Sequence, residues 1–172
     1  MANQSQGLNE DRVACLIGGF IFLLGMAYFW GVDLIGWICK MGMWVGDPMK
    51  CFKAAHKGYM EGWQALICTY VFVTVMLAVG IKLMKGNVFR FIIAFTVVYF
   101  IAICCYVIGA NAYIAANPTQ IAKMGVPWAL GLSTEAGLIV ALIVGIIIGN
   151  LFPGVVEYLH DACRPELFVK IA

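Results

Sequence analysis

Charged residues are scarce in this sequence. Asp, Glu, Lys and Arg make up 12% of its 172 residues and hydrophobic residues 63%, whereas soluble domains carry about 25% and about 45–50%. The mean hydropathy is +0.94. A soluble fold of this size keeps too much of its chain at the surface to hide so much apolar area. The composition therefore excludes a soluble domain and predicts an integral membrane protein.

Patterns typical of nucleic-acid-binding and metal-binding proteins are also missing. Eleven basic and nine acidic residues give a net charge of +2, which is too balanced for a nucleic-acid-binding face. Seven cysteines are present, an odd number, without a CxxC pair. Four of them lie inside apolar runs, where free cysteine acts as a small packing residue; they are Cys15, Cys68, Cys104 and Cys105. We therefore expect no metal site.

Enzyme signatures are absent as well. The two histidines, His56 and His160, lie outside the apolar runs, so a haem held by two histidines inside a helix bundle lacks its ligands. Neither a serine-nucleophile motif nor a phosphate-binding loop occurs. The sequence predicts no enzyme activity and no cofactor.

Long apolar runs are what the sequence does contain. A helix needs about 20 apolar residues to span a bilayer, and the segments at about 13–39, 63–84, 89–110 and 133–152 meet that requirement. The expected fold is an all-α integral membrane protein with about four transmembrane helices plus short interfacial helices. We expect a multi-pass protein of a bacterial-type inner (plasma) membrane, surrounded by the lipid bilayer.

The ends of these runs carry further signals. The polar tail 1–12 lacks the basic region and cleavage site of a secretory signal, so we expect it to be retained. The first run either forms one long tilted helix or breaks at Gly31 and continues along the membrane surface. The short polar turn 85–87 predicts that segments 63–84 and 89–110 form an antiparallel hairpin. Its basic flanks favour a cytoplasmic position for this turn.

The two connectors differ in how clearly they can be interpreted. Segment 40–62 mixes lysines with aromatic residues, which is typical either of an amphipathic helix on the lipid headgroups or of a solvated loop. Segment 117–120 is more specific, because Asn117 is a good N-cap and Gln120 stands three residues later. It predicts a short helix that ends at Gly125.

Few polar residues lie in or beside the spans, and an ionisable group there is a functional candidate because it is costly to bury. The candidates for binding substrate or a coupling ion are Glu135, Asn150, Asn111 and Asp33. Glu135 could bind a proton or cation, or could simply offset the macrodipole at a helix start. The same alternatives hold for Asp33, nearer an interface. Each asparagine could cap backbone groups or line a polar cavity.

The last span contains two features of helix packing. Gly145 and Gly149 have the GxxxG spacing that allows another helix to approach closely. Segment 149–154 then combines glycines with Pro153, which predicts a helix break. Transporters use broken helices to expose backbone dipoles to ions, but the break could equally be an ordinary helix end.

Several segments of the chain resemble the YeiH-type family of proposed sulfate exporters. The most specific are LSTEAGLIVAL at 132–142 and GNLFPG at 149–154, followed by 162–170. Segments 31–37 and 111–116 are similar to long-form members of that family, which carry extra N-terminal helices. The resemblance implies a multi-span transporter core related to folds built from inverted repeats. It carries over no proven substrate residue.

This resemblance implies a division of the chain into a polar tail (1–12), N-terminal transmembrane helices (13–128) and the start of a transporter core (129–172). Because segment 166–172 looks like the opening of another apolar helix, we expect truncation there. The leading hypothesis is the N-terminal membrane portion of a secondary transporter that exports sulfate or a related small inorganic anion. Its partners would be the remaining transporter helices or identical subunits, and no nucleic acid. The alternative is a small self-contained membrane protein that acts by helix association as an assembly or accessory subunit.

Overall fold

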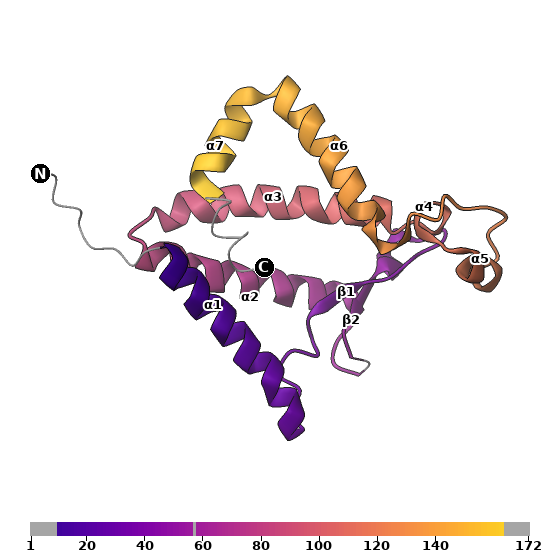
Figure 1. Cartoon of the computed structure of the whole chain (residues 1–172), viewed down its shortest axis with the longest axis horizontal. Coiled ribbons are helices and arrows are strands. Elements are labelled where there is room, and N and C mark those ends of the chain that lie inside the picture. The colour runs from indigo at the N-terminus through magenta and orange to yellow at the C-terminus, as the bar shows by residue number, and fades with distance from the viewer. Residues whose placement is uncertain (1–9, 57, 164–172) are drawn as a thin grey trace, which may run out of the picture.

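The computed structural model describes residues 10–56 and 58–163, which are mainly helical (Figure 1). Three helical stretches are long and apolar enough to cross a bilayer: Asp11–Trp30, Gly62–Leu83 and Val88–Gly109. A fourth span would consist of Ala136–Leu151 and Pro153–His160, which are bent by 114° relative to each other. The chain is thus the helical membrane protein that its composition predicts, with a lipid bilayer as its environment.

Helices α2 (Gly62–Leu83) and α3 (Val88–Gly109) form the predicted antiparallel hairpin. A capping box between Glu61 and Gln64 starts α2. Lys85 adopts a left-handed conformation (φ 58°) in the turn, and the Asn87 side chain accepts a hydrogen bond from Arg90 N at 3.2 Å to start α3. These polar groups satisfy backbone atoms that a helix end leaves unpaired, so the chain reverses within a few residues.

Helix α1 (Glu10–Met26) packs on this hairpin through its first half only. Its residues Val13, Ala14 and Ile17 are buried together with side chains from α2 and α3, namely Leu77, Ile81, Phe91 and Phe95. Beyond that contact α1 diverges from α2 (Figure 1). It ends in the 3-10 turn η1 (Ala27–Trp30), closed by Gly31 at φ 79°. Of the two alternatives for segment 13–39, the break at Gly31 is therefore the one that the structure adopts.

Segment 40–62 forms neither the amphipathic helix nor the simple loop that its composition suggests. Strands β1 (Cys39–Met41) and β2 (Phe52–Ala54) pair antiparallel, and the hairpin packs beside α2, where Cys39 N donates to Thr69 Oγ1 at 2.8 Å. Between the strands, Asp47 caps only a single 3-10 turn, η2 (Pro48–Cys51). Because strand pairing joins residues distant in sequence, helical capping signals could not reveal it.

The connector between α3 and α6 contains α4 (Ala112–Ala115), α5 (Pro118–Met124) and the 3-10 turn η3 (Ser133–Glu135). Helix α5 is as predicted: Asn117 and Gln120 form a capping box, and Gly125 ends the helix at φ 66°. A small core of Ala112, Ala116 and Val126 holds the connector together.

Helices α6 (Ala136–Leu151) and α7 (Pro153–Cys163) form two sides of a triangle over α3 (Figure 1). The bend between them lies at Phe152 (φ −133°, ψ 62°), because a residue before proline is disfavoured in the helical region. At the far end, Arg90 of α3 lies 4.6 Å from the ring centre of Tyr158 on α7. The predicted helix opening at 166–172 lies outside the described residues.

Candidate functional site

Asp33 is the centre of a polar cluster between the end of α1 and the β-hairpin. Its Oδ2 pairs with His56 Nδ1, its Oδ1 accepts a hydrogen bond from Ile35 N at 3.3 Å, and its backbone carbonyl accepts one from Tyr59 Oη at 3.0 Å. The Asp33 side chain is 17% exposed and that of His56 51%. The pair therefore ties the segment after η1 to the segment after β2.

The Asp33 cluster borders a cleft of about 440 Å³. Gly25 and Tyr28 contribute to it from α1 and η1, and Ile35 and His56 from the segments that follow. The Tyr28 ring stacks on the His56 imidazole, with centroids 5.8 Å apart. A mainly apolar cleft with one hydrogen-bonded aspartate–histidine pair at its edge could hold a small ligand with a polar end.

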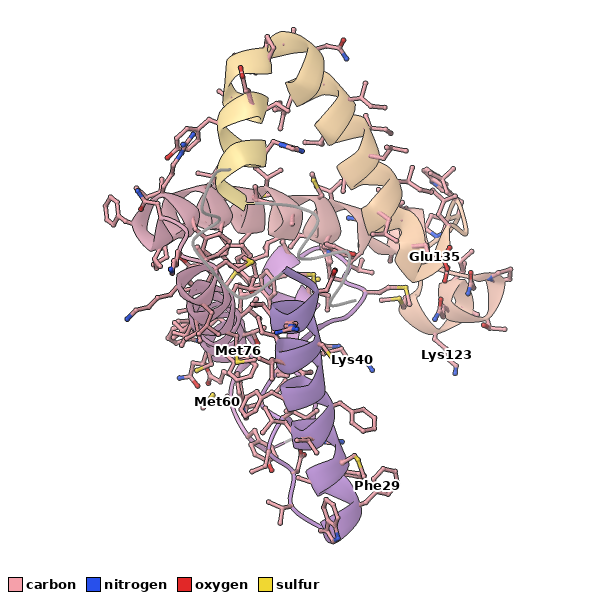
Figure 2. The ribbon with its side chains drawn as sticks, turned by 60° about the vertical axis from the view of Figure 1, so that its left-hand side comes forward. Phe29, Lys40, Met60, Met76, Lys123 and Glu135 are labelled. Atoms are coloured by element: carbon pink, nitrogen blue, oxygen red, sulfur yellow. The ribbon has the colours of Figure 1, made fainter. Side chains whose placement is uncertain are left out.

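Glu135 lies far from this cluster along the chain and is exposed at the start of α6. Figure 2 shows it at the connector end of the molecule, near the helix that carries Lys123. Its side chain makes no capping hydrogen bond to α6. The position suits an acidic residue at a helix N-terminus and leaves the carboxylate available to solvent or to a partner.

Both candidate asparagines bond to backbone groups of their own segments. Asn111 Oδ1 accepts from Tyr113 N at 3.0 Å and caps α4. Asn150 Nδ2 donates to the Ile146 carbonyl at 2.7 Å, one turn back in α6. Asn150 remains exposed, two residues before the bend at Phe152. Of the two, Asn150 is the one positioned beside the helix break.

The structure does not bring the four candidates into one site. The cleft beside Asp33 is lined by none of Glu135, Asn111 and Asn150. Sequence reasoning missed His56 as the partner of Asp33, because nothing in the sequence links residues 23 positions apart. Within residues 10–56 and 58–163, no group of three or more His, Cys, Asp or Glu side chains could hold a metal ion.

The glycines of α6 occupy two different environments. A β-carbon built on Gly145 or Gly149 would meet nothing within 4 Å, so this predicted packing face is open within the described part of the chain. Close helix packing instead occurs at Gly109 of α3 and Gly137 of α6, where an added β-carbon would collide with neighbouring atoms. Sequence reasoning missed this pair because Gly109 and Gly137 lie on different helices without a shared motif.

The β-hairpin region contains two thiols, those of Cys39 and Cys51, that burial keeps protonated to higher pH. Burial raises the pKa of the Cys51 thiol above its usual range, and burial likewise raises the pKa of Cys39. Cys51 has no exposed surface. A thiol that stays protonated is a poor nucleophile and metal ligand, which suits Cys51 as a buried packing residue.

The chain is similar to the UPF0324 membrane protein NE0724 of Nitrosomonas europaea. The two are 29% identical over 166 residues, which cover 95% of this chain and 34% of that protein. The chain thus spans about a third of the length of the curated relative that it matches. No family model matches the chain, and no solved structure matches it. The similarity supports a membrane protein and names no substrate.

Proposed function

We propose that this chain is the N-terminal membrane portion of a secondary transporter in a bacterial-type inner membrane, exporting sulfate or a related small inorganic anion. The observation that carries the proposal is the break between α6 and α7, a bend of 114° in an otherwise apolar pair of helices. It lies within the segments that resemble the YeiH-type family. The similarity to the membrane protein NE0724 over 95% of the chain supports the membrane location that the proposal requires.

The physical argument concerns backbone polar groups. A helix that breaks inside the hydrocarbon region interrupts its own hydrogen bonding, and such breaks are tolerated where protein or a water-filled cavity surrounds them. Transporters place substrate and ion sites at breaks of this kind. The bend at Phe152, with the exposed amide of Asn150 beside it, is therefore the best candidate for a position facing the transport pathway.

The polar candidates have distinct roles under this proposal. Asn150 would contact the anion near the break, and Glu135, exposed at the start of α6, would bind the coupling proton or cation. Asp33, paired with His56, and Asn111, which caps α4, would hold segments in place. The proposed protein moves its substrate unchanged and performs no chemical reaction on it.

The test is efflux of radiolabelled sulfate from vesicles that contain the full-length protein. Asn150→Ala should lower the rate by at least about tenfold if the amide contacts the anion, since a lost hydrogen bond to a charged group corresponds to such a factor. Asn87→Ala is the matched control, because Asn87 caps α3 away from the break. Sulfate efflux no faster than from empty vesicles would contradict the proposal.

One observation favours a second candidate function, an assembly or accessory subunit that acts by helix association. Gly145 and Gly149 present an open face of α6 on which nothing in the described chain packs. Replacing both by isoleucine should then abolish a partner complex in detergent. Unchanged association in the double variant would count against this function.

A further inference from the structure

The β-hairpin places two lysines directly opposite each other. Lys40 on β1 pairs with Lys53 on β2 in the antiparallel register, and both side chains are exposed. Directly opposed like charges destabilise a strand pair, whereas opposite charges stabilise it. No carboxylate of the described chain forms a salt bridge with either lysine. The arrangement therefore has a local excess of positive charge that an anion would neutralise.

The two lysines border a cleft of about 560 Å³. Lys53 Nζ lies 3.3 Å from the position that a β-carbon on Gly42 would occupy, so the absence of a side chain there leaves room for the ammonium group. His56 is the third basic residue of the lining, and no acidic residue contributes to it. The imidazole of His56 is paired with Asp33, which lines the separate cleft of about 440 Å³ described above.

Close packing and backbone hydrogen bonds fix the backbone that forms the cleft. Gly62, at the start of α2, packs so closely on β2 that a β-carbon there would lie 1.8 Å from the Phe52 carbonyl oxygen. Ala55 N donates to the Ile38 carbonyl at 2.9 Å and extends the strand pairing. Since a preorganised site loses less entropy on binding, this support favours a specific ligand over transient ion pairing.

The carboxylate of Glu61, which stands between two cleft-lining residues in the sequence, has another partner. Glu61 follows Met60, which lines the cleft, but Glu61 Oε2 accepts a hydrogen bond from Trp63 Nε1 at 2.9 Å. Trp63 is half exposed at the start of an apolar span, where tryptophan is typical of the membrane surface. The cleft thus lies beside the end of a span, where anionic headgroups and soluble anions are both within reach.

We propose that Lys40 and Lys53 form a binding site for a tetrahedral oxyanion, a phosphate- or sulfate-type group that bridges the two ammonium groups across the hairpin. Ammonium groups form strong charge-assisted hydrogen bonds with such oxygens. The oxyanion comes either from an anionic phospholipid headgroup or from free solute. This site lies outside the helix break and does not depend on the transport proposal.

The experiment uses the full chain in two arms. In detergent, inorganic sulfate or phosphate is titrated at constant ionic strength against chloride, and binding is measured by equilibrium dialysis. In nanodiscs, native mass spectrometry counts the phosphatidylglycerol molecules retained, with phosphatidylcholine as the neutral lipid. Lys40→Gln and Lys53→Gln should each weaken binding by about tenfold or more in one arm. Lys123→Gln, on the separate helix α5, should leave binding unchanged.

A charge reversal separates binding from structural support. Lys40→Glu creates an opposite-charge pair with Lys53, so it should raise the unfolding temperature without added anion and abolish anion binding. If the glutamine variants lose sulfate or phosphate binding in detergent, the ligand is a free oxyanion. If they lose phosphatidylglycerol retention in nanodiscs, the ligand is a lipid headgroup. Absence of binding in both arms, or equal binding by the wild type and both glutamine variants, would overturn the site. The sulfate efflux assay reports on transport separately.

Discussion

The backbone of Gly137 lies directly against the α-carbon of Gly109. A β-carbon at position 109 would come within 2.3 Å of Gly137 N, and one at position 137 within 2.6 Å of Tyr106 Cδ1. Atoms do not approach so closely, so the crossing of α3 and α6 requires glycine at both positions. Membrane helices commonly use small residues in this way, and the start of the broken span is thereby anchored to α3.

Gly109→Ala should destabilise the fold by about 1–3 kcal/mol, the usual cost of overpacking. The destabilisation should appear although alanine normally favours a helix over glycine by up to about 1 kcal/mol. Gly145→Ala is the matched control, since its β-carbon meets open space, and it should leave stability unchanged or slightly raised. Thermal unfolding in detergent, followed by circular dichroism, measures both. Equal midpoints for the two variants would show that the crossing tolerates a methyl group.

Pro153→Ala should straighten the pair α6 and α7. Proline restrains Phe152 from the helical region, and alanine removes that restraint and supplies a backbone N–H. Spin labels at Ile143 and Val155, both exposed, should report a longer mean distance by electron paramagnetic resonance. Pro127→Ala, in the connector, is the control. An unchanged distance distribution in Pro153→Ala would mean that tertiary contacts, such as that of Arg90 with Tyr158, hold the bend.

Cys51 should resist alkylation in the folded protein. Burial raises the pKa of its thiol, so the reactive thiolate forms only at higher pH than in an exposed cysteine. On a background without other cysteines, Cys51 should react more slowly at pH 8 than a cysteine introduced by Lys50→Cys with Cys51→Ser. Both should react alike after unfolding in detergent. Comparable rates in the folded proteins would contradict the burial of Cys51.

The raised pKa of Cys51 also has a consequence for stability. The folded state holds the thiol proton more tightly than the unfolded state, so this group stabilises the fold below the ordinary thiol pKa. That contribution should diminish as the pH rises above about 8.5. In Cys51→Ala the decline in unfolding temperature over this range should be smaller, as differential scanning fluorimetry would measure. An identical decline in both proteins would assign it to other groups.

Asp33→Ala should loosen the attachment between the segment after η1 and the β-hairpin. The expected effect is less than about 1 kcal/mol, because the pair with His56 is partly solvated. Hydrogen exchange should accelerate a few-fold at the amides of Ala55 and His56, which donate to the carbonyls of Ile38 and Gly36. Asp47→Ala is the control, since Asp47 caps η2. Unchanged exchange in Asp33→Ala would show that backbone pairing alone holds the two segments.

Much of the helical layout could be predicted, because it depends on interactions between neighbours in sequence. The capping box of Asn117 and Gln120 and the left-handed Gly125 were found where the residue types indicate them. The turn between α2 and α3 and the break at Phe152 follow the same logic. The division into domains remains a prediction, and so does the role of each candidate residue in transport.

The β-hairpin and the Asp33 cluster could not be predicted in this way. A mixture of lysines and aromatic side chains suits an interfacial helix, a loop or a strand pair equally well. The hairpin forms because Cys39–Met41 pairs with Phe52–Ala54 and packs on α2. That packing places Asp33 next to His56, and neither residue carries a local signal for the other.

The sequence by itself determined the membrane class, the long apolar helices and their capped ends, because hydrophobicity and capping act over one or two turns of chain. Only the tertiary structure decided that Lys40 faces Lys53, that Asp33 meets His56, and that Gly109 rather than Gly145 forms a close helix contact in the chain. These pairings depend on which packed arrangement of the whole chain has the lowest free energy. Local residue preferences do not encode that choice.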